Sequence, residues 1–311
     1  ASEVVWQVIR MNIEQLNTIH GIAGELVFVP GKGAGPWIEI NNGQARAVIS
    51  VYADQVLSYR PIGEPEDVLF IGGKAYLEAG KAIKGGIPVC WPWFGPDPLG
   101  RGRPAHGFVR NRLWSVVATE NTAAGATRVT LGLRDTQDSR ALWPYRFDLN
   151  IEITVGDRLG VKLVTRNTGD RIITISQALH TYFRVADIHR VKVFGLEDTD
   201  YLDKAGSGER KTQIGAVSVA EEVDRIYLDV RPELLIDDEV FQRRIGISSG
   251  GNKTAVVWNP WAKIAAEMGD LEDDDYQRFI CIETTNAAED VVHVPVNGEY
   301  HLSAVYRVER E

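Results

Sequence analysis

Apolar and polar residues alternate along much of the chain with the two-residue period of a half-buried strand. In 147–155 the odd-numbered positions are apolar and polar residues stand between them. These apolar residues are Phe147, Leu149, Ile151, Ile153 and Val155. Gly156 and Asp157 interrupt the alternation, which resumes over 159–163. Because successive side chains of a strand point to opposite faces of a sheet, the pattern predicts a hairpin with one buried face.

The same alternation runs to the C-terminus. Asn297-Gly298 is a pair favoured in type I′ turns. The apolar face that follows it holds Tyr300, Leu302, Ala304, Tyr306 and Val308. Further strands are predicted over 44–52, 128–134, 171–179, 190–197, 254–258 and 279–284.

Helical periodicity is scarce. Only the segment after Pro232, around 234–241, suggests a short helical turn. Strands do not alternate with helices, which argues against a doubly wound or barrel α/β fold. Many short strands separated by Gly and Asn turns are typical of a large antiparallel β-sandwich. Since no repeat, low-complexity tract or linker divides the sequence, we expect an all-β fold with a single domain over residues 1–311.

Composition excludes several classes of partner. The 311 residues are 44% hydrophobic, which is enough for a large core, and the net charge is -9. An acidic chain without a basic tail repels nucleic acid and anionic membranes, so neither is an expected partner. The sequence contains no run of about twenty apolar residues, so no membrane span is predicted. An anionic ligand would therefore need positive charge concentrated at its own site.

Several local patterns point away from metals and cofactors. No His/Cys cluster has zinc spacing, and no phosphate loop occurs. The acidic run 270–275 lacks the spacing of a calcium loop and favours a solvated loop. Residues 246–250 match G-x-S-x-G, but the strand-like sequence after them indicates a chance match. We therefore expect neither a metal nor a cofactor.

The cysteines and the N-terminus suggest a cellular location. Cys90 and Cys281 are too few for a disulfide scaffold and favour buried thiols in a reducing compartment. The first residues are polar and acidic and lack an apolar signal core. These features predict a cytoplasmic protein, or an organellar one whose transit peptide has been removed.

The longest Gly- and Pro-rich stretch, 84–107, is the first candidate for function, and its Trp and Phe content argues against disorder. It begins with Lys84 and two glycines. Paired glycines let the backbone approach a ligand closely and the lysine could contact an anion, although a plain tight turn fits equally well. At the end of the stretch His106 and Arg110 stand close together beside a glycine, where the alternative is an ordinary surface loop.

A second candidate combines a histidine and a carboxylate. His180 ends a predicted strand and is flanked by aromatic residues, a setting in which a satisfied core histidine is the commoner outcome. Glu283 lies in an otherwise apolar strand, where burial is costly unless the carboxylate is paired or used in chemistry. Such a pair suits proton transfer near neutral pH.

Six motifs occur in order along the chain and together resemble one family. They are Lys-Gly-Gly-Ile-Pro-Val-Cys-Trp-Pro-Trp-Phe-Gly, His-Gly-Phe-Val-Arg-Asn, Ala-Leu-His-Thr-Tyr-Phe, Val-Asp-Arg-Ile-Tyr, Val-Trp-Asn-Pro-Trp and Ile-Cys-Ile-Glu-Thr. This series resembles the glucose-6-phosphate 1-epimerases of the galactose mutarotase-like superfamily, over roughly residues 20–308. The resemblance implies a large supersandwich and an isomerase that interconverts the α and β anomers of a hexose 6-phosphate.

The resemblance also implies roles for individual residues. It makes His180 the general acid and Glu283 the general base, with Asp224 binding sugar hydroxyls. We expect the nearby carboxylate to raise the pKa of His180 and keep it protonated for the first step. Lys84 and Arg110 would bind substrate, with His106 lining the pocket. We further expect Lys84 and Arg110 to hold the phosphate, with Arg103 and Arg112 as helpers from the same loop region. Among the tryptophans, Trp93 and Trp258 are the best candidates for the sugar groove.

Two positions depart from the family pattern. Lys84 replaces the usual arginine and offers a point charge where arginine grips phosphate with two parallel hydrogen bonds. Ala105 replaces a glutamine that often touches the ligand, so any contact from this position must come from the backbone. Both changes leave the proton chemistry intact but bear on substrate identity.

Three other functions remain open at this stage. A mutarotase of unphosphorylated aldoses would lack the phosphate contacts of Lys84 and Arg110. A sugar-binding regulatory protein would have no need of an acid and a base. A glycoside hydrolase would use two carboxylates, for which Asp224 and Glu283 are available, but leaves His180 unexplained. We expect a small sugar phosphate as the partner and a monomer or weak dimer.

Overall fold

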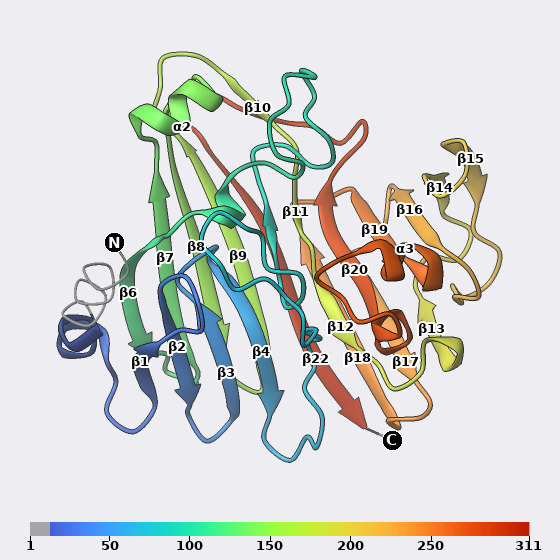
Figure 1. Ribbon diagram of the computed structural model, residues 1–311, viewed down its shortest axis with the longest axis horizontal. Coiled ribbons are helices and arrows are strands. Elements are labelled where there is room, and N and C mark those ends of the chain that lie inside the picture. Colours follow the sequence, from blue (N-terminus) through green and yellow to red (C-terminus); the bar gives the residue numbers. More distant parts are fainter. Residues whose placement is uncertain (1–12, 311) are drawn as a thin grey trace.

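The computed structural model describes residues 13–310, which form an antiparallel β-sandwich with little helix (Figure 1). Residues 13–20 are helical. The short helices α2 and α3 span Gln137–Leu142 and Trp261–Glu267. Single 3₁₀ turns η1, η2 and η3 cover Val109–Asn111, Ile188–Arg190 and Asp275–Arg278. The predicted all-β antiparallel class is confirmed.

Strands of three large sheets make up the fold. The first sheet has the order β1 (Leu26–Pro30), β2 (Pro36–Asn41), β3 (Ala45–Ser50) and β4 (Gln55–Pro61). The second, called the β22 sheet, has the order β13 (Val191–Phe194), β17 (Glu233–Asp238), β18 (Arg243–Gly250), β22 (Glu299–Arg310), β9 (Arg158–Asn167), β8 (Phe147–Val155), β7 (Thr127–Arg134) and β6 (Ser115–Asn121).

The third sheet, called the β20 sheet, carries Glu283 and Asp224 on its strands and His180 between two of them. Its order is β15 (Glu209–Thr212), β14 (Asp200–Asp203), β16 (Val223–Leu228), β19 (Thr254–Asn259), β20 (Phe279–Asn286), β11 (Gln177–Leu179) and β5 (Val89–Cys90), and β12 (Tyr182–Arg184) also pairs with β20. A separate pair joins β10 (Ile173–Ile175) to β21 (Val292–Val294).

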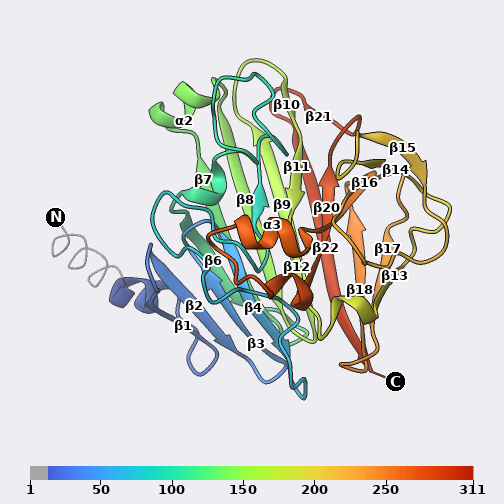
Figure 2. The same cartoon turned by 45° about the vertical axis from the view of Figure 1, so that its right-hand side comes forward.

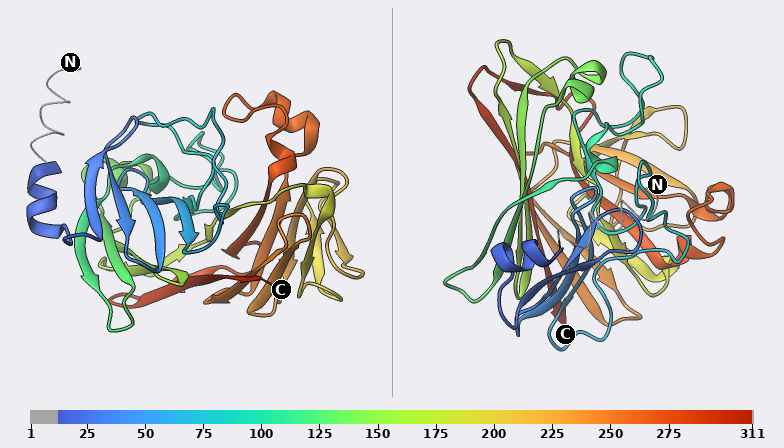
Figure 3. Two further views of the ribbon diagram at one scale, coloured as in Figure 1. Left: turned by 90° about the horizontal axis from the view of Figure 1, so that it is seen from below. Right: turned by 60° about the vertical axis from the view of Figure 1, so that its left-hand side comes forward.

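The β22 sheet forms a base that runs across the molecule. Seen from below, the β1–β4 sheet covers one half of this base and the β20 sheet covers the other (Figure 3). A cluster of buried apolar side chains draws on all three sheets and includes Ile38, Leu163 and Ile282. The expectation of a single domain over 1–311 stays a prediction.

Most strand predictions match the structure because alternating burial follows the alternating sequence. β8 has buried residues at every odd position, and β9 pairs with it across the turn at Gly156 and Asp157. The predicted segment 171–179 divides into β10 and β11, since Ser176 leaves the ladder: its N–H donates to Pro92 and its hydroxyl accepts from Phe94.

Two local predictions were wrong. The suggested helical turn over 234–241 is strand β17 as far as Asp238, with a turn after it; Leu234 and Ile236 are buried, and β17 pairs with β13 and β18. Burial at every second residue is the pattern of a strand and not of a helix. At the C-terminus the turn runs from Pro295 to Gly298, and only Asn297 has a positive φ, of 59°. It joins β21 to β22, which pair with different strands, so no hairpin forms.

The G-x-S-x-G match forms the second half of β18, where every residue pairs with β22. It has no strand-to-helix turn, which confirms that it is a chance match. Within residues 13–310 no helix is both long and apolar enough to cross a membrane.

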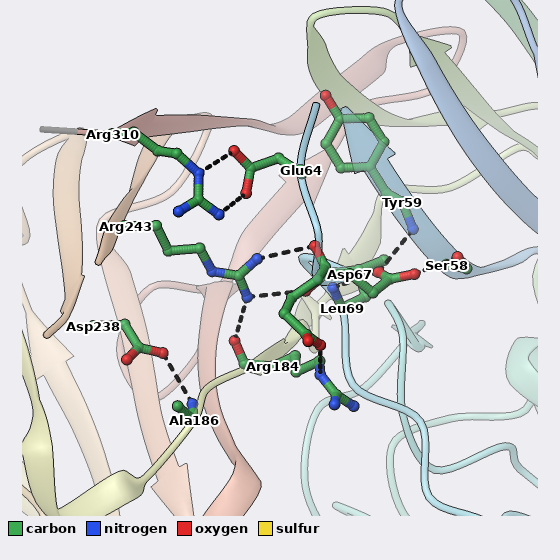
Figure 4. A network of polar contacts seen from close by, with 11 residues as sticks. Ser58, Tyr59, Glu64, Asp67, Leu69, Arg184, Ala186, Asp238, Arg243 and Arg310 are labelled. Carbon is green, nitrogen blue, oxygen red and sulfur yellow. Dashed lines mark hydrogen bonds and ion pairs between the residues drawn. The ribbon is translucent and has the colours of Figure 1, made fainter. Parts of the chain in front are cut away.

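One buried arginine ties the three sheets together (Figure 4). Arg243 of β18 is 2% exposed. Its guanidinium donates to the carbonyls of Glu66 and Asp67, which follow β4, and to the carbonyl of Arg184 at the end of β12. Burial lowers the pKa of Arg243, with Asp238 as the largest opposing influence. Each of the three bonds has a charged donor, which makes this junction stronger than one of neutral groups.

A buried carboxylate without a partner lies in the turn between β3 and β4. Asp54 is fully buried, and neither of its carboxylate oxygens has a hydrogen-bond partner in the structure. Its φ of 56° is left-handed, a conformation that Asp and Asn tolerate better than most residues. Burial raises the pKa of Asp54 well above its usual value, so ionisation of this side chain opposes folding.

We expect Asp54→Asn to increase stability at pH 7. Because the pKa of Asp54 is raised in the folded state, the protonated side chain stabilises the wild-type fold below pH ~4. This stabilisation is lost as the pH rises through the folded pKa, at about 1.4 kcal/mol for each unit by which the pKa is raised. Asn cannot ionise and keeps the left-handed turn. Urea unfolding from pH 4 to 8 should show a difference that grows with pH. A difference independent of pH would contradict the role of ionisation.

Candidate active site

His180 and Glu283 meet in the interior of the β20 sheet. His180 lies between β11 and β12, with its N–H bonded to the carbonyl of Pro88, and Glu283 is in β20. The imidazole Nε2 is 3.3 Å from a carboxylate oxygen of Glu283, and the two residues are 8% and 2% exposed. His180 Nδ1 and the second Glu283 oxygen are buried without a partner in the structure. These unpartnered atoms are available to a ligand.

Burial favours the uncharged forms of both side chains. It lowers the pKa of His180 well below its usual value, and the positive charge of Arg110 lowers it further. Burial also raises the pKa of Glu283, with a contribution from Asp224. The sequence-based expectation that the carboxylate would raise the pKa of His180 was wrong, because desolvation dominates.

Aromatic rings surround the pair. Tyr182 stacks on the His180 ring at 5.1 Å, and Trp258 meets it edge-on at 6.0 Å. Trp258 is partly exposed, which is compatible with its predicted place at the sugar site. Trp93 is 4% exposed and belongs to the hydrophobic core, and its place in the groove stays a prediction.

His106 is fixed as an uncharged donor beside His180. Its φ is 63° and its ring lies 5.7 Å from that of His180. The N–H of Gly95 donates to His106 Nδ1 at 3.2 Å, which places the ring proton on Nε2. Burial and then the charge of Arg110 lower the pKa of His106 to about 3.

Arg110 directs positive charge at the same centre. Its guanidinium donates to the carbonyl of Ala105 at 3.1 Å, and its charge influences the pKa of both His180 and Glu283. Ala105 itself is exposed, and its backbone holds the arginine. No ion pair of Arg110 is present among the described residues, which leaves most of its N–H groups open to an anion.

Lys84 is already paired. Its ammonium lies 2.8 Å from a carboxylate oxygen of Asp270 and 3.1 Å from the sulfur of Met268. Gln55 fixes the backbone on both sides of Lys84 by donating to the carbonyls of Ile83 and Gly85. Lys84 therefore lies where the sequence predicts a contact with an anion, but with a counter-ion in place.

The paired glycines serve the chain itself. Gly85 and Gly86 both have positive φ. A Cβ on Gly85 would lie 2.7 Å from the carbonyl oxygen of Phe70, and one on Gly86 would lie 2.0 Å from that of Val56. The glycines are needed for close packing of backbone on backbone, which is a different reason from the approach to a ligand suggested by the sequence.

Asp224 lies on the same sheet. It is in β16, opposite Trp258 of β19, and β19 separates it from β20. Burial raises the pKa of Asp224, and Lys204 opposes this effect. The negative charge of Asp224 also helps to raise the pKa of Glu283, so the two carboxylates interact electrostatically.

The two suggested helpers are placed differently. Arg103 is buried in an ion pair with Asp97, donates to the carbonyl of Leu142 and stacks on Trp93. Arg112 lies over the ring of Phe108 and its Nε is buried without a partner. Arg103 thus stabilises the conformation of the 84–107 segment. Because its guanidinium already has these partners, it is unsuited to binding a phosphate.

Sequence reasoning missed Asp270 and Met268. The acidic run 270–275 was interpreted as a solvated loop, whereas Asp270 has a 13% exposed side chain and pairs with Lys84. Asp275 is also buried and accepts from Arg278. A lone lysine beside a candidate site in an acidic chain is the signal that could have prompted a search for its counter-ion. Over residues 13–310 no cluster of His, Cys, Asp or Glu could hold a metal ion.

The chain is similar to known proteins over most of its length. Residues 36–307 match the family model described as aldose 1-epimerase. The chain is 34% identical over 272 residues to an Escherichia coli protein, covering 87% of this chain and 90% of that protein. It is 36% identical over 272 residues to a protein of Cenchrus ciliaris, covering 83% and 81%. Both relatives are named "Putative glucose-6-phosphate 1-epimerase".

A solved structure supports the same grouping. The crystal structure of a "putative mutarotase" from Salmonella typhimurium superposes with a TM-score of 0.86 at 28% identity, and covers 96% of this chain and 100% of that one. The predicted mutarotase-like sandwich and the predicted isomerase class are confirmed. With a family match over most of its length and relatives more than 30% identical, the chain belongs to the aldose 1-epimerase family.

Proposed function

We propose that the protein interconverts the α and β anomers of a hexose 6-phosphate, with glucose 6-phosphate as the leading substrate. The observation that carries this proposal is the buried contact between His180 and Glu283 with Arg110 beside it. The acid–base pair suits ring opening, and the arginine suits an anionic group. The names of the two relatives point to the same substrate.

Ring opening needs a base at the C1 hydroxyl and an acid at the ring oxygen. Glu283 as carboxylate removes the proton from the hydroxyl while protonated His180 gives one to the ring oxygen. The open aldehyde then turns about C1–C2 and recloses with the roles exchanged. The pair therefore passes through neutral His180 and protonated Glu283 while the sugar is open, which is the state that burial favours.

The other side chains have supporting roles in this proposal. Asp224 accepts hydrogen bonds from sugar hydroxyls, and His106 donates from Nε2. Trp258 offers an apolar ring to the sugar. Arg110, fixed by the carbonyl of Ala105, binds the phosphate, and Lys84 contributes its remaining N–H.

The experiment is anomerisation of freshly dissolved α-glucose 6-phosphate, followed by NMR of the C1 proton, with free glucose and galactose in parallel. Acceleration of the phosphorylated sugar alone supports the proposal. Acceleration of free sugars alone keeps the chemistry but removes the phosphate site. Absence of any acceleration favours a sugar-binding protein without activity.

Arg110→Ala is expected to raise the KM for glucose 6-phosphate by about 10- to 100-fold, the cost of one charge-assisted contact. The KM for a free sugar, if it is turned over, should change by less than about threefold, since it lacks the anionic group. Steady-state kinetics with both sugars test this difference. Equal effects on both would show that Arg110 does not contact the phosphate.

Other aspects remain predictions. A cytoplasmic location and a monomeric or weakly dimeric state are proposed from the sequence. A glycoside hydrolase is less well supported, since its two carboxylates would leave the buried contact of His180 without a role.

A further inference from the structure

The loop after α3 places an acidic side chain against the candidate site. Met268 and Leu271 of this loop pack in a cluster with Tyr182 and Phe279, and Leu271 is 1% exposed. Glu272 pairs with Lys74 at 2.8 Å. Asp270 is thus held by neighbours on both sides, because the loop is anchored to the β20 sheet and to the segment after β4.

Asp270 neutralises a cation that the site would otherwise present. Its carboxylate is 2.8 Å from Lys84 Nζ, and the side chains of Lys84 and Asp270 are only 19% and 13% exposed. Charges so little exposed to water are weakly screened by salt. The pair has no net charge, so Arg110 is the cation beside His180 and Glu283 whose charge is not balanced by an ion pair among the described residues.

The ion pair also limits what Lys84 can offer a ligand. An ammonium has three N–H donors. One faces Asp270 and a second faces the sulfur of Met268, which leaves one. A phosphate that approaches Lys84 must share it with a carboxylate of like charge. Loop anchoring keeps that carboxylate in place, so the repulsion persists in the bound state.

We propose that Asp270 sets the affinity of the site for anionic substrates, by neutralising Lys84 and competing with the substrate phosphate for it. This inference rests on the proposed function, since it concerns the phosphate of that substrate. Asp270 acts through Lys84 and is a positioning residue. It weakens the grip on the phosphate that substrate and product share, which speeds release of either anomer.

The test replaces Asp270 by Asn, which keeps the size of the side chain and removes its charge. The KM for glucose 6-phosphate is expected to fall by roughly 3- to 10-fold, and its dependence on salt should steepen, because the site gains one unbalanced positive charge. The KM for free glucose should not change. Isothermal titration with inorganic phosphate should show the same gain in affinity without turnover.

Two variants control for charge and loop structure. Asp270→Glu keeps the charge and should stay close to wild type in its KM for glucose 6-phosphate. Asp273→Asn makes the same substitution at an exposed position of the same loop and should leave both KM values unchanged. An unchanged or higher KM for glucose 6-phosphate in Asp270→Asn, with unchanged phosphate affinity, would overturn the inference. Failure of the wild type to convert glucose 6-phosphate would instead overturn the proposed function, and the phosphate titrations would still decide the role of Asp270.

Discussion

His180→Asn and Glu283→Gln are each expected to slow anomer exchange by about 100- to 10,000-fold, the usual contribution of a positioned acid or base. Each replacement keeps the approximate shape of the side chain and removes its ability to exchange a proton. Because the two groups exchange roles within every turnover, loss of either one slows both opening and closing of the ring. NMR of the C1 proton at saturating glucose 6-phosphate measures the effect on kcat.

The same variants should retain the fold. Burial favours the uncharged form of both side chains, and the amides that replace them are uncharged as well. Circular dichroism and thermal unfolding check this point. His301→Asn provides a matched control, because His301 is exposed and pairs with Glu299 on β22. Wild-type turnover in either His180→Asn or Glu283→Gln would exclude the assigned role.

The fold could be predicted from the sequence wherever burial alternates along a strand. β8, β9 and β22 follow the apolar pattern because one face of each packs on the core. The prediction failed over 234–241, where neighbouring strands β13 and β18 impose the extended conformation. Such pairing depends on residues distant in sequence, and a local pattern does not contain it.

The candidate site could be predicted in part for a similar reason. Motif resemblance singled out His180 and Glu283, and the fold brings them to 3.3 Å. Resemblance could not reveal that Lys84 has a counter-ion, because Asp270 lies in a different segment and approaches only when the loop after α3 packs on the β20 sheet. The direction of the His180 pKa was also missed, since desolvation depends on packing from every side.

Arg243→Met is expected to destabilise the protein by roughly 3–5 kcal/mol, the range typical of removing one member of a buried charged network. Met matches the length of the arginine stem but donates no hydrogen bond. The carbonyls of Glu66, Asp67 and Arg184 would lose a charged donor in a place with little access to water (Figure 4). Urea unfolding followed by tryptophan fluorescence gives the free energy of unfolding, with a constant m-value as the check on comparability.

Arg244→Met separates this effect from a general loss of charge. Arg244 is the next residue of β18, and it pairs with Asp237 through side chains that are 42% and 32% exposed. Exposed pairs contribute at most about 1 kcal/mol, so this variant should unfold close to wild type. Equal losses for both variants would show that the three carbonyls do not depend on Arg243. A selective loss for Arg243→Met would mean that one guanidinium fixes how the β22 sheet, the segment after β4 and β12 meet. Figure 2 shows β12 between β4 and β18. Because Phe70 of the segment after β4 donates to the carbonyl of Tyr182 in β12, beside His180, the same junction also supports the geometry of the acid–base pair.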